Sequence, residues 1–133
     1  MELIKNKIPL RLAIHAVLSI LCIVIIFHLL VLSGIVPYTI VWGGRFQNET
    51  QLRNFEVVSV IVNAFVILVI ATKGHYINLH IPTKILNSIL WLLVLLFSVN
   101  TIGNLLAKTT METIIFTPIT FILALLCFRI VKG

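Results

Sequence analysis

The sequence predicts an all-α integral membrane protein, an antiparallel four-helix bundle with both termini in the cytoplasm. Its 133 residues are 60% hydrophobic and 11% charged, whereas soluble domains are about 45–50% apolar and about 25% charged. A chain this short cannot bury so much apolar surface in a core that faces water. We therefore expect a multi-pass protein of the plasma or inner membrane, with residues 1–133 forming one domain.

Four apolar runs predict the transmembrane helices, because a helix crosses a bilayer with about 17–25 residues and pairs its own backbone polar groups there. The predicted spans are approximately 8–36, 52–72, 85–106 and 113–131. The first run exceeds the apolar region of a signal peptide, which has about 7–15 residues, so we expect it to be retained. Pro118 lies inside the fourth run and is expected to kink that helix.

The basic residues predict the orientation. Seven of them fall on the side of the termini, namely Lys5, Lys7, Arg11, Lys73, Lys84, Arg129 and Lys132. Three fall on the other side, namely Arg45, Arg53 and Lys108. Because cytoplasmic loops carry the excess of Lys and Arg, this bias places both termini in the cytoplasm.

Polar residues are predicted to gather in the outer half of the bundle, whereas Ile89–Phe97 in the inner half of the third span is continuously apolar. Ionisable residues in or near a span mark either a paired structural contact or a functional site. We expect a polar pocket that opens to the outside. Its candidate residues are Glu56, Ser59, Asn63, Asn100, Thr101, Asn104 and Thr117, with Trp42 and Arg45 as a lid. The alternative is that these side chains are hydrogen-bonded contacts between packed helices.

Glu56 has two interpretations of its own. Arg53 lies three residues earlier on the same helical face and Arg45 is a second candidate partner, so the carboxylate could be ion-paired. A carboxyl group that faces only Asn and Ser would instead suit acid–base chemistry or proton coupling. His15 and His28 do not share a face, and each is interpreted as a single hydrogen-bonded histidine. A metal site needs three or four converging ligands, so the sequence predicts no metal site and no cofactor.

The runs VWGGRF, FEVVSVIVN and SVNTIGNLLAK resemble those of a group of small bacterial membrane proteins with four spans, and the likeness covers nearly the whole chain. This resemblance implies a fold and no particular activity. A fainter resemblance is to the EXPERA group, which includes sterol isomerases and the sigma-2 receptor and uses acidic residues in a membrane pocket. Glu56 corresponds to one of these acids, and a second intramembrane acid is not present in this sequence.

The expected function is that of a non-enzymatic accessory protein that binds a lipid or another small amphiphile in its outer pocket. One alternative is a membrane-embedded enzyme, an isomerase like those of the EXPERA group, that uses Glu56 as general acid or base. Another is a small proton-coupled exporter. Expected partners are membrane lipids, a small amphiphilic ligand, and a second copy of the chain or another membrane protein. Nucleic acid is not expected, because no basic run is interleaved with aromatic residues.

Overall fold

The computed structural model describes residues 8–35, 49–106 and 112–133, and all of its regular elements are helical. The elements are α2 (Leu10–Leu32), α3 (Glu49–Lys73), α4 (Thr83–Leu105), the π-helical segment η3 (Glu112–Phe116) and α5 (Thr117–Lys132). Four stretches of these helices are long and apolar enough to cross a membrane, namely Leu10–Leu32, Arg53–Lys73, Thr83–Leu105 and Thr113–Lys132. The prediction of an all-α protein with four such helices is confirmed.

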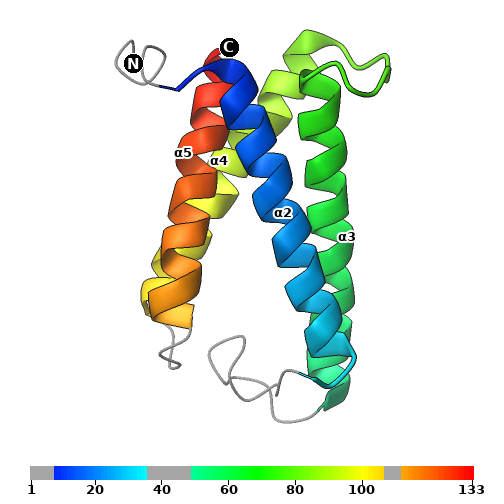
Figure 1. Cartoon of the computed structure of the whole chain (residues 1–133), viewed down its shortest axis with the longest axis vertical. Helices are drawn as coiled ribbons and strands as arrows, with labels where there is room; N and C mark the ends of the chain where they lie inside the picture. Colours follow the sequence, from blue (N-terminus) through cyan, green and yellow to red (C-terminus); the bar gives the residue numbers. More distant parts are fainter. Residues whose placement is uncertain (1–7, 36–48, 107–111) are drawn as a thin grey trace.

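The helices are arranged as two pairs, α2 with α3 and α4 with α5, and α2 also packs along α5 (Figure 1). The beginning of α2, the C-terminus and the connection between α3 and α4 lie together at the top of Figure 1. We call this the terminal end of the bundle. Toward the opposite end, which we call the open end, the two pairs diverge. Contact between α3 and α4 is accordingly much less extensive than contact within either pair.

The buried core fills the half of the bundle nearest the terminal end. Each helix contributes its segment closest to that end: 13–21 of α2, 66–71 of α3, 86–97 of α4 and 123–131 of α5. Close packing of this kind is the main contact that holds transmembrane helices together, because lipid tails are as apolar as the side chains themselves. The core therefore joins the two pairs at one end and leaves them apart at the other.

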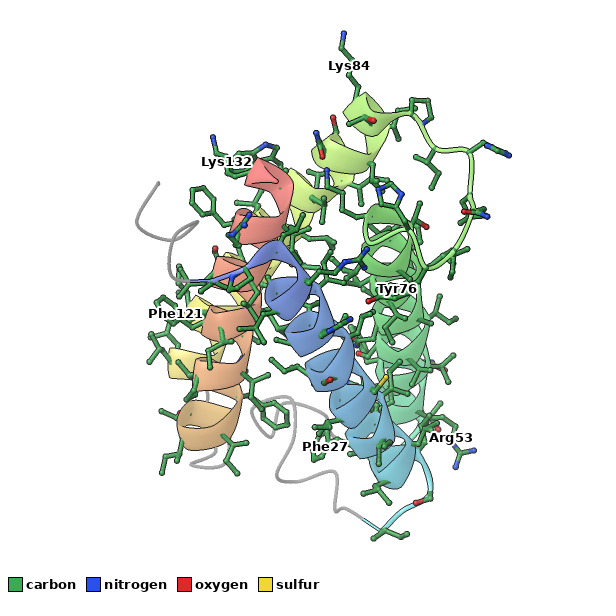
Figure 2. All side chains as sticks on the ribbon, turned by 45° about the horizontal axis from the view of Figure 1, so that its top comes forward. Phe27, Arg53, Tyr76, Lys84, Phe121 and Lys132 are labelled. Carbon is green, nitrogen blue, oxygen red and sulfur yellow. The ribbon has the colours of Figure 1, made fainter. Side chains whose placement is uncertain are left out.

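Large apolar side chains cover the outside of the bundle. Ile23, Leu92 and Ile114 are each at least 64% exposed, and they belong to three different elements. Phe121 likewise points away from the bundle in Figure 2. A water-soluble monomer rarely exposes apolar patches of such extent. Together with the length of the four helices, this surface indicates a multi-pass membrane protein.

Two helix ends have a distinctive backbone geometry. Pro118, which was expected to kink the fourth helix, lies in the first turn of α5, directly after the π-helical segment η3. A proline is tolerated there because the first turn of a helix leaves its N–H groups without intrahelical acceptors. At the end of α3 the left-handed residue is His75, with φ of 64°, and the N–H of Tyr76 donates to the carbonyl of Ala71. This is the hydrogen-bond pattern of a Schellman motif, with histidine where glycine is usual.

Candidate functional site

A cavity of about 470 Å³ lies between the two helix pairs toward the open end; we call it the interhelical pocket. Helices α2, α3, α4 and α5 and the segment η3 all contribute to its wall. The lining residues are Val24, Phe27, His28, Val58, Ser59, Val62, Asn63, Val66, Leu96, Phe97, Val99, Asn100, Gly103, Asn104, Phe116, Ile119, Thr120 and Leu123. The wall is thus mainly apolar, with a small number of hydrogen-bonding groups, which is the usual composition of a small-molecule site.

The polar groups of the pocket differ in whether they already form hydrogen bonds within the protein. The amide of Asn63 donates to the carbonyl of Ser59 in its own helix, at 2.7 Å. The side chain of Asn100 is exposed, and within the described part of the chain it makes no hydrogen bond. Its amide therefore offers two donors and an acceptor to an occupant of the pocket.

A hydrogen-bonded seam joins α4 to α5 beside the pocket. The hydroxyl of Thr120 accepts from the hydroxyl of Thr101 at 3.0 Å and lies 3.4 Å from the amide nitrogen of Asn104. The hydroxyl of Thr113 in turn donates to the carbonyl of Asn104 at 3.2 Å. Contacts of this kind hold packed membrane helices together. The hydrogen bonds of Thr101, Asn104, Thr113 and Thr120 therefore agree with the alternative that these polar side chains join packed helices.

The most deeply buried polar contact lies on the opposite wall. Glu56 of α3 is fully buried, and its Oε2 is 2.5 Å from Nδ1 of His28 in α2. The side chain of His28 is 14% exposed and lines the interhelical pocket, whereas Glu56 does not belong to the described lining. A carboxylate bonded to one ring nitrogen of a histidine fixes the orientation and the tautomer of the ring. Glu56 can thus orient His28, which borders the cavity.

The structure brings together four of the predicted site residues and separates others from them. Ser59, Asn63, Asn100 and Asn104 line the pocket as expected from their common depth. Thr101, Thr117 and Glu56 lie outside the described lining. The predicted lid residues Trp42 and Arg45 fall outside the residues that the structure describes.

Arg53, one of the two candidate ion-pair partners of Glu56, forms no ion pair with it among the described residues, and the other candidate, Arg45, lies outside them. Arg53 is exposed and points away from the bundle in Figure 2, although it lies only one helical turn from the carboxylate. A guanidinium near the end of a span gains hydration by turning toward water, and the buried carboxylate contacts a histidine of the neighbouring helix instead.

His28 is the site residue that the sequence analysis missed. It was judged by its helical face relative to His15, which has a different partner, the hydroxyl of Tyr76. The position of each residue along its span would have indicated the contact. The spans of α2 and α3 run in opposite directions, and His28 and Glu56 both lie several residues from the open end. A hydrogen-bonding ring and a carboxyl group at the same depth are candidates for a direct contact, since polar groups in spans tend to pair.

Among the described residues no group of three or more His, Cys, Asp or Glu side chains could hold a metal ion. The described lining of the pocket offers hydrogen bonding by amides and hydroxyls, and proton transfer at the imidazole of His28. Comparison of the chain with protein-family models, with curated proteins and with solved structures found no match.

Proposed function

We propose that this protein binds a small amphiphile in the interhelical pocket. The observation that carries the proposal is the cavity of about 470 Å³ with a mainly apolar wall and a few hydrogen-bonding groups. Ligand pockets commonly have volumes of about 300–1,000 Å³ and this composition. The core ends where the pocket begins, so an occupant does not have to displace packed side chains.

The pocket supports an occupant with an uncharged polar group. Asn100, Asn104 and Ser59 can donate and accept hydrogen bonds but carry no charge. The imidazole of His28 already makes a hydrogen-bonded contact with the carboxyl group of Glu56. Burying an unpaired charge against such a wall would be costly. A hydroxyl, an ester or an amide attached to a hydrocarbon chain fits better, and membrane lipids are the natural source of such a molecule.

The proposal includes an orientation. We place the chain in the cell membrane as an antiparallel bundle, with both termini in the cytoplasm and the open end toward the outer leaflet. The excess of Lys and Arg on the side of the termini supports this orientation. A second copy of the chain or another membrane protein would then have access to the amphiphile through the open end.

Native mass spectrometry of the detergent-purified full chain tests the proposal. We expect the wild-type chain to retain a mass that dissociates on mild activation and that extraction identifies as an amphiphile. The Asn100→Leu variant should lose this species about fivefold more readily, as expected for one lost hydrogen bond. The matched control is Asn54→Leu on the exposed surface of α3, which should behave as wild type. A wild-type chain that carries no such mass, or equal loss in both variants, would contradict the proposal.

A second candidate function is a membrane-embedded enzyme, and the His28–Glu56 contact is the observation that favours it. In this candidate His28 is the general acid or base at the pocket, and Glu56 orients it. The Glu56→Gln variant separates the two candidates. It should leave retention of the amphiphile close to wild type and abolish any conversion of that amphiphile into a product of different mass or retention time.

A further inference from the structure

A second cavity, of about 560 Å³, lies at the terminal end of the bundle; we call it the cationic pocket. Its wall is formed by the beginning of α2, the end of α3, the connection between α3 and α4, the beginning of α4, and Gly133 after α5. Its ionisable side chains are Arg11, Lys73, His75 and His80, and no Asp or Glu belongs to the described lining. Arg11 and Lys73 provide two strong positive charges against the single main-chain carboxylate of Gly133, so the cavity is complementary in charge to an anion.

The protein holds the two strong cations of this pocket in defined positions. A terminal nitrogen of the Arg11 guanidinium donates to the carbonyl of Gly74 at 3.0 Å, and the guanidinium lies 5.2 Å from the centre of the Tyr76 ring. The ammonium of Lys73 donates to Oδ1 of Asn87 at 3.0 Å. A guanidinium has five N–H donors and an ammonium has three. Both groups are thus anchored and still have donors for a ligand.

The rest of the wall is largely apolar. The apolar lining residues are Leu10, Ile14, Ile77, Leu79, Ile81 and Leu86. A small inorganic anion would gain nothing from this surface, whereas the glycerol and the first carbons of an acyl chain could cover it. The combination of fixed cations with an apolar wall fits a molecule that is anionic at one end and apolar at the other.

We propose that the cationic pocket binds the phosphate group of an anionic membrane phospholipid, with Arg11 and Lys73 as the contacting residues. Guanidinium groups suit phosphate because they bind it through two parallel hydrogen bonds, and lysine adds a point charge. Basic pockets between helices on the cytoplasmic side are known places for such headgroups. The site lies at the opposite end of the bundle from the interhelical pocket, so it does not depend on the occupant of that pocket.

The alternative is that the two cations only join the ends of helices. Arg11 links α2 to the residue that follows α3, and Lys73 links α3 to α4. If that were their whole role, substitutions would change stability and leave lipid selection unaltered. The experiment therefore measures both quantities on the same samples.

The full chain in a non-ionic detergent is titrated with short-chain phosphatidylglycerol, with phosphatidylcholine of the same chain length, and with inorganic phosphate. The variants are Arg11→Gln, Lys73→Gln, the double variant and Arg11→Lys. The matched control is Lys84→Gln: Lys84 lies at the same end, points away from the bundle in Figure 2 and does not belong to the described lining, so the net charge changes equally.

We expect the wild-type chain to bind phosphatidylglycerol more tightly than phosphatidylcholine. Each Gln variant should bind phosphatidylglycerol about fivefold more weakly, with little change in its affinity for phosphatidylcholine. The Arg11→Lys variant should retain most of the preference, and Lys84→Gln all of it. Raising the NaCl concentration from about 0.1 M to about 0.5 M should reduce the preference of the wild type more than that of the double variant.

Four results would overturn the proposal. The first is a wild-type chain that does not distinguish the two lipids. The second is an equal loss of preference in Lys84→Gln and in Arg11→Gln, which would indicate net charge and not a site. The third is inorganic phosphate that binds as tightly as phosphatidylglycerol, which would make the apolar wall irrelevant. A drop in unfolding temperature with unchanged lipid preference would assign Arg11 and Lys73 to the helix ends alone.

Discussion

Oε2 of Glu56 and Nδ1 of His28 lie 2.5 Å apart, and this contact joins α3 to α2 at a depth where the carboxyl group is fully buried. It is located beside the interhelical pocket, below the region in which the apolar core holds the helices together. The contact therefore stabilises one helix pair where packing with the other pair is weakest.

A double-mutant cycle measures this contact. His28→Leu and Glu56→Leu should each lower the free energy of unfolding by about 1–3 kcal/mol, because each leaves a buried polar partner behind. The double variant should lose less than the sum, with a coupling of about 0.5–3 kcal/mol. Equilibrium unfolding in mixed micelles provides the three values. Strictly additive losses would show that the two side chains do not stabilise each other.

Gly74 is predicted to be required for the approach of α2 to the end of α3. A Cβ at Gly74 would lie 3.1 Å from Cγ2 of Ile14 and 3.1 Å from Cδ2 of Tyr76. Gly74→Ala should therefore cost about 1–3 kcal/mol. Gly103 in α4 is the control, because its Cβ would meet nothing within 4 Å. Gly103→Ala should stabilise the helix by up to about 1 kcal/mol, and thermal unfolding followed by circular dichroism compares the two. A neutral Gly74→Ala would contradict the close approach.

His75 occupies the left-handed region with φ of 64°, which costs a side chain with a Cβ about 1 kcal/mol or more. His75→Gly should therefore raise the free energy of unfolding by about 1 kcal/mol. His75→Val should lower it, because a β-branched residue fits this region poorly. The same unfolding assay applies. Equal stability of the Gly and Val variants would be incompatible with the Schellman ending of α3.

The hydroxyl of Thr120 connects α5 to α4 through Thr101 and Asn104. Thr120→Val keeps the shape of the side chain and removes the shared hydroxyl, so the free energy of unfolding should fall by about 1–2 kcal/mol. The control is Ser98→Ala, since the hydroxyl of Ser98 donates only to Val94 of its own helix among the described contacts. It should change stability by less than about 0.5 kcal/mol. Similar losses in both variants would argue against a role for the seam in joining the helices.

The helices and their membrane character could be predicted from the sequence because hydrophobicity and length determine them locally. The expected second span begins at about 52, and the membrane-spanning part of α3 is Arg53–Lys73, preceded by a polar turn that begins at Glu49. A window of apolar residues locates the membrane-spanning part of a helix, but not a polar turn that extends the same helix into water. The same limitation applies to η3, since nothing in the composition of residues 112–116 distinguishes a π-helical turn from an α-helical one.

The depth of each polar residue along its span could also be predicted, and this depth placed Ser59, Asn63, Asn100 and Asn104 around one cavity. The rotation of each helix about its own axis could not be predicted, because it depends on which neighbouring helix each face contacts. This is why Thr101 was assigned to the pocket and lies in the α4–α5 seam. It is also why the sequence left the partner of Glu56 open and did not indicate its contact with His28. The two-pair arrangement that opens the pocket is a tertiary property of the packed core, which no single span reveals.

Thiol labelling at position 99 tests the central claim most directly. In a background in which Cys22 and Cys127 are replaced by alanine, Val99→Cys places one thiol in the wall of the interhelical pocket and keeps its hydrogen-bonding groups. A membrane-impermeant maleimide added from outside the cell should label this thiol, and the amphiphile extracted with the protein should block the labelling. The lipid-facing control Leu92→Cys should stay unlabelled. Failure to label position 99 from outside, or labelling that the amphiphile does not slow, would contradict an outward-facing binding pocket.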